Sequence, residues 1–136
     1  MSKPVPPVRA YMTTTPHSIG VDQPLTQAHE MMRSLRIRHL PVLHGGKLVG
    51  VVSDRDLHHV ESLGSVDPKA ITVEEAMTPR PYAVDPDAPL DEVASTMAEH
   101  RYGCAIVTQN RKTVGVLTTT DVCRALAELL RGRLAT

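Results

Sequence analysis

The chain has 136 residues, of which 41% are hydrophobic and 22% are charged, as in an ordinary globular domain. Fifteen basic residues balance fifteen acidic ones, and three tyrosines are the only large aromatic side chains. Neither a cationic field nor base-stacking platforms are therefore available, and we expect no nucleic-acid partner.

The two cysteines, Cys104 and Cys123, lack CxxC spacing and predict buried thiols rather than a disulfide framework. The opening residues have no apolar stretch of signal-peptide length, and no segment approaches about 18 apolar residues. We expect a cytoplasmic protein without membrane association.

The first predicted elements are a short extended piece at 18–19 and a helix with Pro24 in its first turn. Leu25, Ala28 and Met32 recur there at helical spacing. Strands are predicted at 40–43 and 48–52 around the turn "HGGK", and a helix at 53 that stops at Gly64.

A linker with turn chemistry follows, and Thr72 with Glu75 predicts a capped short helix into Met77. The first order of elements then returns: a helix from Pro89, strands at 105–108 and 113–117, and a last helix that stops at Gly132.

The chain is an internal repeat. Residues 12–59 align without gaps with residues 77–124 at a shift of 65, and 14 of the 48 pairs are identical. A fixed period of this size indicates a duplicated unit. Neither copy is expected to bury its apolar face alone, so the two copies should pack on each other.

The pattern "MT…P", an amphipathic helix, "RHLPV", a turn and "KLVGVVSDRDL" resembles a cystathionine-β-synthase (CBS) domain, and "GCAIV…KTVGVLTTTDV" resembles a second one. The resemblance implies an α/β (α+β) fold in which two β-α-β-β-α motifs pack through their sheets as a pair, or Bateman module. The implied bounds are 8–64 for the first motif, 65–76 for the linker and lead-in helix, and 77–131 for the second.

The resemblance also implies clefts between the motifs for adenosine-containing ligands: AMP, ADP, ATP, S-adenosylmethionine or NAD-type dinucleotides. Asp56 and Asp121 close the G-h-h-[ST]-x-x-[DN] motif and would bind the ribose hydroxyls. The implied phosphate-binding residues are Ser53, Arg55, Arg38, His39, Thr118 and Thr120. The implied adenine contacts are Thr13, Pro16, His17, Ile19, Thr78, Pro81, Tyr82 and Val84.

The same residues have a structural interpretation. Ser53 with Asp56, and Thr118 with Asp121, have the spacing of a capping box at a helix start. A helix N-terminus also favours phosphate, and a carboxylate binds a diol through charge-assisted hydrogen bonds. The sequence leaves both roles open, with capping as the resting state.

The basic residues are unequally divided between the copies. Arg38, His39 and Arg55 align with Gly103, Cys104 and Thr120, so only the first copy could neutralise several phosphate charges. We therefore expect two unlike sites; the alternative for Arg38 is a solvated residue between helix and strand. His17 and Tyr82 could likewise be turn residues.

Catalysis and metal binding are disfavoured. Asp54 and Asp56 could suggest a carboxylate pair or a Mg²⁺ ligand, but residues two apart diverge at a helix start and no partner base is identifiable. His58 and His59 are adjacent and lack metal-ligand spacing.

These observations together predict a non-enzymatic sensor with no required cofactor, in which an adenine nucleotide or S-adenosylmethionine is a regulatory ligand. Binding would be signalled by a conformational change to an unidentified effector protein, and the resemblance implies a homodimer. The alternative is a ligand-free CBS scaffold for oligomerisation or protein docking.

Overall fold

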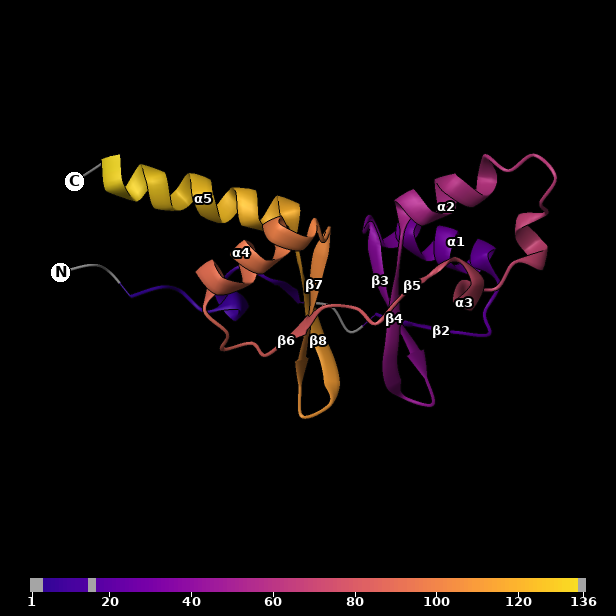
Figure 1. The fold of residues 1–136 in the computed structure, drawn as a ribbon, viewed down its shortest axis with the longest axis horizontal. Helices are drawn as coiled ribbons and strands as arrows, with labels where there is room; N and C mark the ends of the chain where they lie inside the picture. Colours follow the sequence, from indigo (N-terminus) through magenta and orange to yellow (C-terminus); the bar gives the residue numbers. More distant parts are fainter. Residues whose placement is uncertain (1–3, 15–16, 135–136) are drawn as a thin grey trace. The chain divides into compact units, whose positions relative to one another are not determined.

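The computed structural model describes residues 4–14 and 17–134. It is a mixed α+β fold in which the described residues form two four-stranded sheets and five α-helices (Figure 1). The α-helices are α1 (Leu25–Leu35), α2 (Asp54–Glu61), α3 (Val73–Ala76), α4 (Leu90–His100) and α5 (Thr119–Leu134). The 3₁₀ helices are η1 (Val8–Ala10) and η2 (Pro68–Ala70). The strands are β1 (Thr13–Thr14), β2 (Ile19–Gly20), β3 (His39–His44), β4 (Lys47–Ser53), β5 (Thr78–Pro79), β6 (Ala83–Val84), β7 (Cys104–Gln109) and β8 (Lys112–Thr118).

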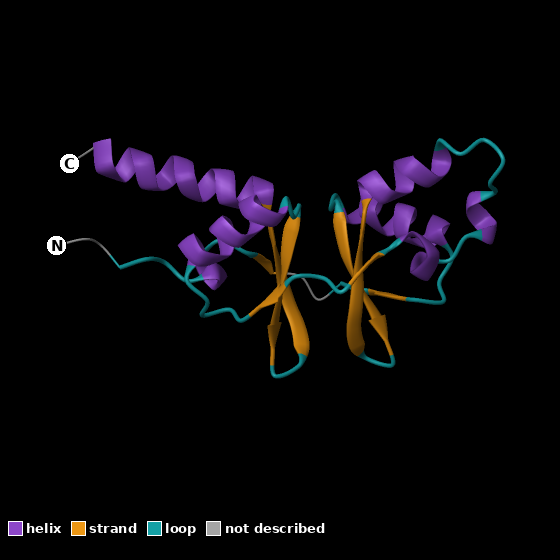
Figure 2. Ribbon diagram, in the orientation of Figure 1, coloured by secondary structure: helices purple, strands orange, loops and turns teal. Residues whose placement is uncertain are grey.

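The chain forms two compact units, which we call the central unit and the terminal unit. The central unit comprises residues 17–81, and the terminal unit comprises residues 4–14 together with 82–134. In each unit the helices lie on one face of the sheet (Figure 2). The compact units therefore do not coincide with the two sequence copies.

The difference arises from the opening strand of each copy. Strand β1 pairs antiparallel with β8, and β5 pairs antiparallel with β4, so each opening "MT" segment joins the sheet of the other copy. The resulting strand orders are β2-β3-β4-β5 in the central unit and β1-β8-β7-β6 in the terminal unit. The fold thus brings the start of the chain against the strand that leads into α5.

The four long strands confirm the sequence prediction, with each one a residue longer at both ends. Their two hairpins turn at Gly45-Gly46 and at Asn110-Arg111, and all four residues have positive φ, from 52 to 81°. Positive φ at both central residues is the type I′ geometry, whose twist matches that of the flanking strands. The expected turn "HGGK" therefore includes one residue of each flanking strand, and "QNRK", between β7 and β8, does the same.

The helix ends were predicted less well. Pro24 and Pro89 precede the first helical residue and are the N-caps of α1 and α4, rather than lying within the first turn. Thr72 caps α3 as predicted, since it accepts a hydrogen bond from the Glu75 backbone. The predicted stop at Gly132 is wrong, because α5 continues through it to Leu134.

Each unit has a hydrophobic core of its own, between its sheet and its helices. Fully buried Leu40 and Val52 lie in the central core, and fully buried Leu117 and Val107 lie in the terminal core.

Cys104 is buried as predicted, but the prediction for Cys123 is wrong, because this residue is exposed on α5. Among the described helices, none combines the length and the apolar composition that crossing a bilayer requires.

Candidate functional site

The two acidic motifs form equivalent caps where a strand runs into a helix. At the β4–α2 junction, Asp56 Oδ2 accepts hydrogen bonds from the Ser53 backbone at 2.8 Å and from the Ser53 hydroxyl at 3.0 Å. The Asp56 backbone in turn donates to the Ser53 hydroxyl oxygen at 3.2 Å. This capping box confirms the structural interpretation of "SDRD".

The β8–α5 junction repeats the arrangement. Asp121 Oδ2 accepts from the Thr118 backbone at 2.9 Å and from the Thr118 hydroxyl at 3.0 Å, and the Asp121 backbone donates to the Thr118 hydroxyl oxygen at 3.2 Å. Both carboxylates are consequently held in place by their own helix starts, which removes much of the cost of orienting them for a ligand.

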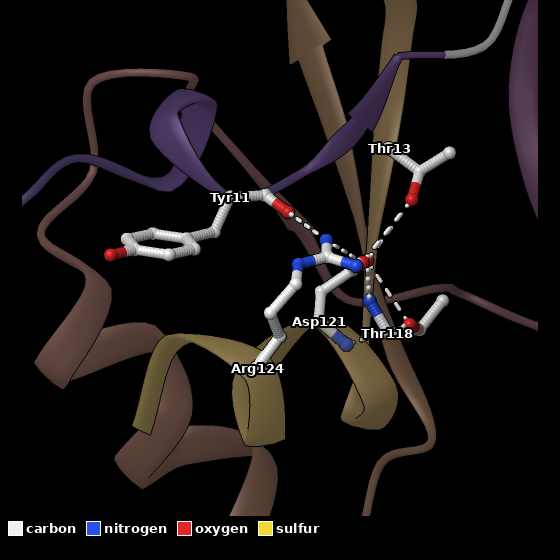
Figure 3. Close-up of polar contacts among 5 residues, drawn as sticks. All are labelled: Tyr11, Thr13, Thr118, Asp121 and Arg124. Atoms are coloured by element: carbon white, nitrogen blue, oxygen red, sulfur yellow. Dashed lines mark hydrogen bonds and ion pairs between the residues drawn. The ribbon is translucent and has the colours of Figure 1, made fainter. Parts of the chain in front are cut away.

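Asp121 has further partners that the capping box does not supply (Figure 3). The Thr13 hydroxyl, from β1, lies 3.2 Å from Oδ1 and 3.3 Å from Oδ2. Arg124 Nη2 donates to Oδ1 at 2.8 Å and lies 3.4 Å from the Tyr11 carbonyl oxygen. The Asp121 residue is only 3% exposed as a result.

Asp56 in the central unit is half-buried, and its hydrogen bonds within the described residues are those with Ser53. All the donors reach Oδ2, so Oδ1 is available as an acceptor. The residues at the positions of Thr13 and Arg124 are Thr78, which is exposed on β5, and His59, which is exposed on α2. The two carboxylates therefore have the same cap but different surroundings.

The basic residues predicted for phosphate lie in the central unit with Asp56. Arg55 is exposed in the first turn of α2, and His39 is half-buried and pairs with Ser53 across β3 and β4. Arg38 is exposed, and its side chain lines a pocket of about 200 Å³ with Asp54 and His58. Asp56 is not among the residues that line that pocket.

The residues predicted to contact adenine differ in their burial and in their neighbours. Ile19 belongs to the hydrophobic core of the central unit, where it is 5% exposed. Tyr82 is half-buried, and the centroid of its ring lies 5.3 Å from the ring centroid of Tyr102. Pro16 lies outside the described residues. The other predicted contacts are half-buried His17, Pro81 and Val84 and exposed Thr78. Thr13 is brought directly to an acidic motif, by its hydrogen bond to Asp121.

The phosphate candidates of the second copy complete the predicted set. Thr118 is half-buried and already hydrogen-bonded within its cap, whereas Thr120 is exposed in the first turn of α5. Within the described ranges, no three His, Cys, Asp or Glu side chains are grouped to hold a metal ion.

Sequence reasoning missed Arg124 and Tyr11. Arg124 follows Asp121 by three residues, the spacing at which side chains on a helix meet, and this spacing could have indicated the ion pair. The contact with Tyr11 could not be foreseen, because these residues are 113 positions apart and meet only through the exchange of the opening strands.

Comparison with known proteins identifies the fold and its family. The family model for the CBS domain matches twice, at residues 8–62 and 73–128. The chain belongs to the CBS domain family. It is 35% identical over 98 residues to the uncharacterized protein YlbB of Bacillus subtilis, a match that covers 71% of this chain and 66% of YlbB.

Two solved structures of CBS proteins contain adenosine-type ligands. The CBS domain pair of MJ0100, in complex with 5′-methylthioadenosine and S-adenosyl-L-methionine, is 26% identical and has a TM-score of 0.82, covering 92% of this chain and 98% of that one. CBSX2 in complex with AMP, a CBS-pair protein of Arabidopsis thaliana, is 27% identical and has a TM-score of 0.78, covering 90% and 97%. The CBS pair is thus a fold on which adenosine-containing molecules are bound.

Proposed function

We propose that this CBS protein is a non-enzymatic regulatory module that binds an adenosine-containing ligand: AMP, ADP, ATP, S-adenosylmethionine or an NAD-type dinucleotide. The observation that carries the proposal is the Asp56 carboxylate, which its helix cap holds in place while Oδ1 remains available. The ligands bound by MJ0100 and CBSX2 support the choice of ligand class.

The chemistry of the site fits a nucleoside with a ribose diol. An ionised carboxylate that accepts from a hydroxyl makes a charge-assisted hydrogen bond, which is stronger than a neutral one. The start of α2 adds the partial positive charge of a helix N-terminus, which favours a phosphoryl group. Arg55 in the same turn supplies a guanidinium, whose planar set of N–H donors matches the geometry of a phosphoryl group.

The proposed role of the bound ligand is to select one conformation of the module and so to signal to an effector protein. A ligand shifts such an equilibrium only by its difference in affinity for the two conformations, so no reaction of its own is needed. The proposed location is the cytoplasm, because an exposed thiol such as Cys123 persists in a reducing compartment.

The proposal includes a homodimer. Leu126, Leu129 and Leu130 lie on one side of α5 and are 57%, 46% and 46% exposed. Three neighbouring exposed leucines favour burial against another chain. The same leucines favour the second candidate function, a ligand-free scaffold that uses the fold only for oligomerisation or docking.

Thermal unfolding with a panel of ligands separates the two functions. AMP, ADP, ATP, S-adenosylmethionine and NADH are each added to the wild type, with adenine as a control that lacks the ribose. A ligand at about 100 times its Kd stabilises the folded protein by about 2.7 kcal/mol, a shift of several degrees for a chain of this size. If no member of the panel shifts the transition, the sensor function is wrong and the scaffold is favoured.

A further inference from the structure

We infer that the two acidic sites are not equivalent in function: Asp56 binds the ribose diol, whereas an intramolecular ion pair with Arg124 closes the Asp121 site. This inference rests on the proposed function and assigns it to one of the two motifs. It makes Arg124 the residue that decides how many ligands one chain binds.

The hydrogen bonds of Asp121 leave little room for a ligand. A carboxylate offers about four lone-pair positions. Asp121 accepts from the Thr118 backbone, the Thr118 hydroxyl, the Thr13 hydroxyl and Arg124, so both of its oxygens are engaged. A diol needs two acceptor positions and would have to displace donors that are already in place (Figure 3).

Arg124 would also obstruct the approach of a ligand to the Asp121 carboxylate. Its side chain is 52% exposed, whereas that of Asp121 is 4% exposed, so the ion pair joins a buried carboxylate to a side chain that solvent reaches. The same guanidinium nitrogen reaches the Tyr11 carbonyl oxygen, and it therefore connects α5 to the segment that leads into β1. A ligand approaching Asp121 from solvent would meet Arg124 first.

The central unit provides an internal comparison. The threonine that reaches Asp121 has an identical counterpart, Thr78, so a threonine at this position does not distinguish the two motifs. The residue three positions after the aspartate does distinguish them, because it is Arg124 in one unit and His59 in the other. His59 is exposed, and Asp56 Oδ1 keeps its acceptor capacity.

The test exchanges these two residues and counts bound ligand by isothermal titration calorimetry with AMP. The wild type is expected to bind one AMP per chain, and His59→Arg to weaken that site by about 10-fold or more, since a charged donor then competes for the carboxylate. Arg124→His is expected to add a second site. The matched controls are Ser65→Arg, which adds a charge at an exposed position of the central unit, and Arg131→His, which removes one from an exposed position of α5. Both controls should bind as the wild type does.

Other results would overturn the inference. Two AMP molecules bound to the wild type, an unchanged affinity in His59→Arg, or a single site in Arg124→His would each show that Arg124 does not set the stoichiometry. Failure of the proposed function has a different signature, because neither the wild type nor Arg124→His would then bind AMP or any other member of the ligand panel. Circular dichroism of each variant checks that a lost site is not a lost fold.

Discussion

The carbonyl oxygen of Thr13 lies 2.9 Å from the position that a β-carbon on Gly115 would occupy. The carbonyl oxygen of Thr78 has the same relationship, at the same distance, to Gly50 in the other unit. Both contacts occur where an opening strand pairs with the strand before a helix. The glycine of the repeated "VGV" segment is thus required by the close approach of the opening strand.

Gly115→Ala is therefore expected to destabilise the protein by about 1–3 kcal/mol, because the new methyl group would overlap the Thr13 carbonyl oxygen, a backbone atom that cannot move aside as the flexible Met12 side chain can. Thermal or urea unfolding measures the loss. Gly64→Ala is the matched control, since a β-carbon there meets nothing within 4 Å, and it should be neutral or slightly stabilising. Equal stability of the two variants would show that β1 is not held as described.

The composition of the compact units predicts which fragment folds. Residues 17–81 contain all four strands of their sheet and a complete core, so this fragment should unfold cooperatively by itself. Residues 8–64, the first motif as drawn from the repeat, lack α3 and β5 and should show a broad transition. Circular dichroism with urea compares them. A cooperative transition only in the 8–64 fragment would contradict the exchange of opening strands.

Tyr11 is expected to titrate abnormally. A hydrogen bond from its hydroxyl to the Glu128 carboxylate raises the pKa of Tyr11 above its ordinary value of 10.0, and partial burial and the negative charge of Glu128 act in the same direction. Since the folded-state pKa is the higher one, this contact stabilises the fold below pH 10.0, and its contribution is lost as the pH rises through the raised pKa.

Ultraviolet titration of the tyrosinate band tests the Tyr11 contact. Glu128→Gln should bring one of the three tyrosine transitions to lower pH, and Tyr11→Phe should remove that transition. Identical titration curves for the wild type and Glu128→Gln would rule the contact out.

The leucines of α5 predict the oligomeric state. The wild type should be a dimer by sedimentation equilibrium, and Leu126→Gln with Leu130→Gln should weaken it by at least 10-fold, since each leucine buried at an interface contributes about 1.5–3 kcal/mol. Leu63→Gln is the control, because Leu63 is 45% exposed but lies outside α5. A monomeric wild type, or a dimer that the double variant leaves unchanged, would contradict the prediction.

Much of the local structure could be predicted from the sequence, because short-range patterns determine it. Alternating apolar residues and turn residues gave both long hairpins, and the spacing of Thr72 and Glu75 gave the cap of α3. The stop at Gly132 failed because a glycine ends a helix only where the chain adopts the conformation that it permits. Here the helical conformation continues through Gly132 to Leu134.

The features that depend on pairing between distant segments could not be predicted. The duplication indicated two equal motifs, but the opening strands pair in the opposite copy, and this exchange carries Thr13 and Tyr11 to Asp121. The sequence attributes the expected difference in phosphate binding between the two sites to three basic residues, Arg38, His39 and Arg55. The structure adds a second source of inequality, the ion pair of Arg124 with Asp121.

Binding of AMP and of 2′,3′-dideoxy-AMP to the wild type and to Asp56→Ala tests the role of the diol most directly. In the wild type, loss of the two hydroxyls should weaken binding by about 10-fold or more, as expected for hydrogen bonds to a charged group. In Asp56→Ala the two ligands should bind with equal affinity, because the acceptor is gone. Equal affinity for both ligands in the wild type would contradict the proposal that Asp56 binds a ribose.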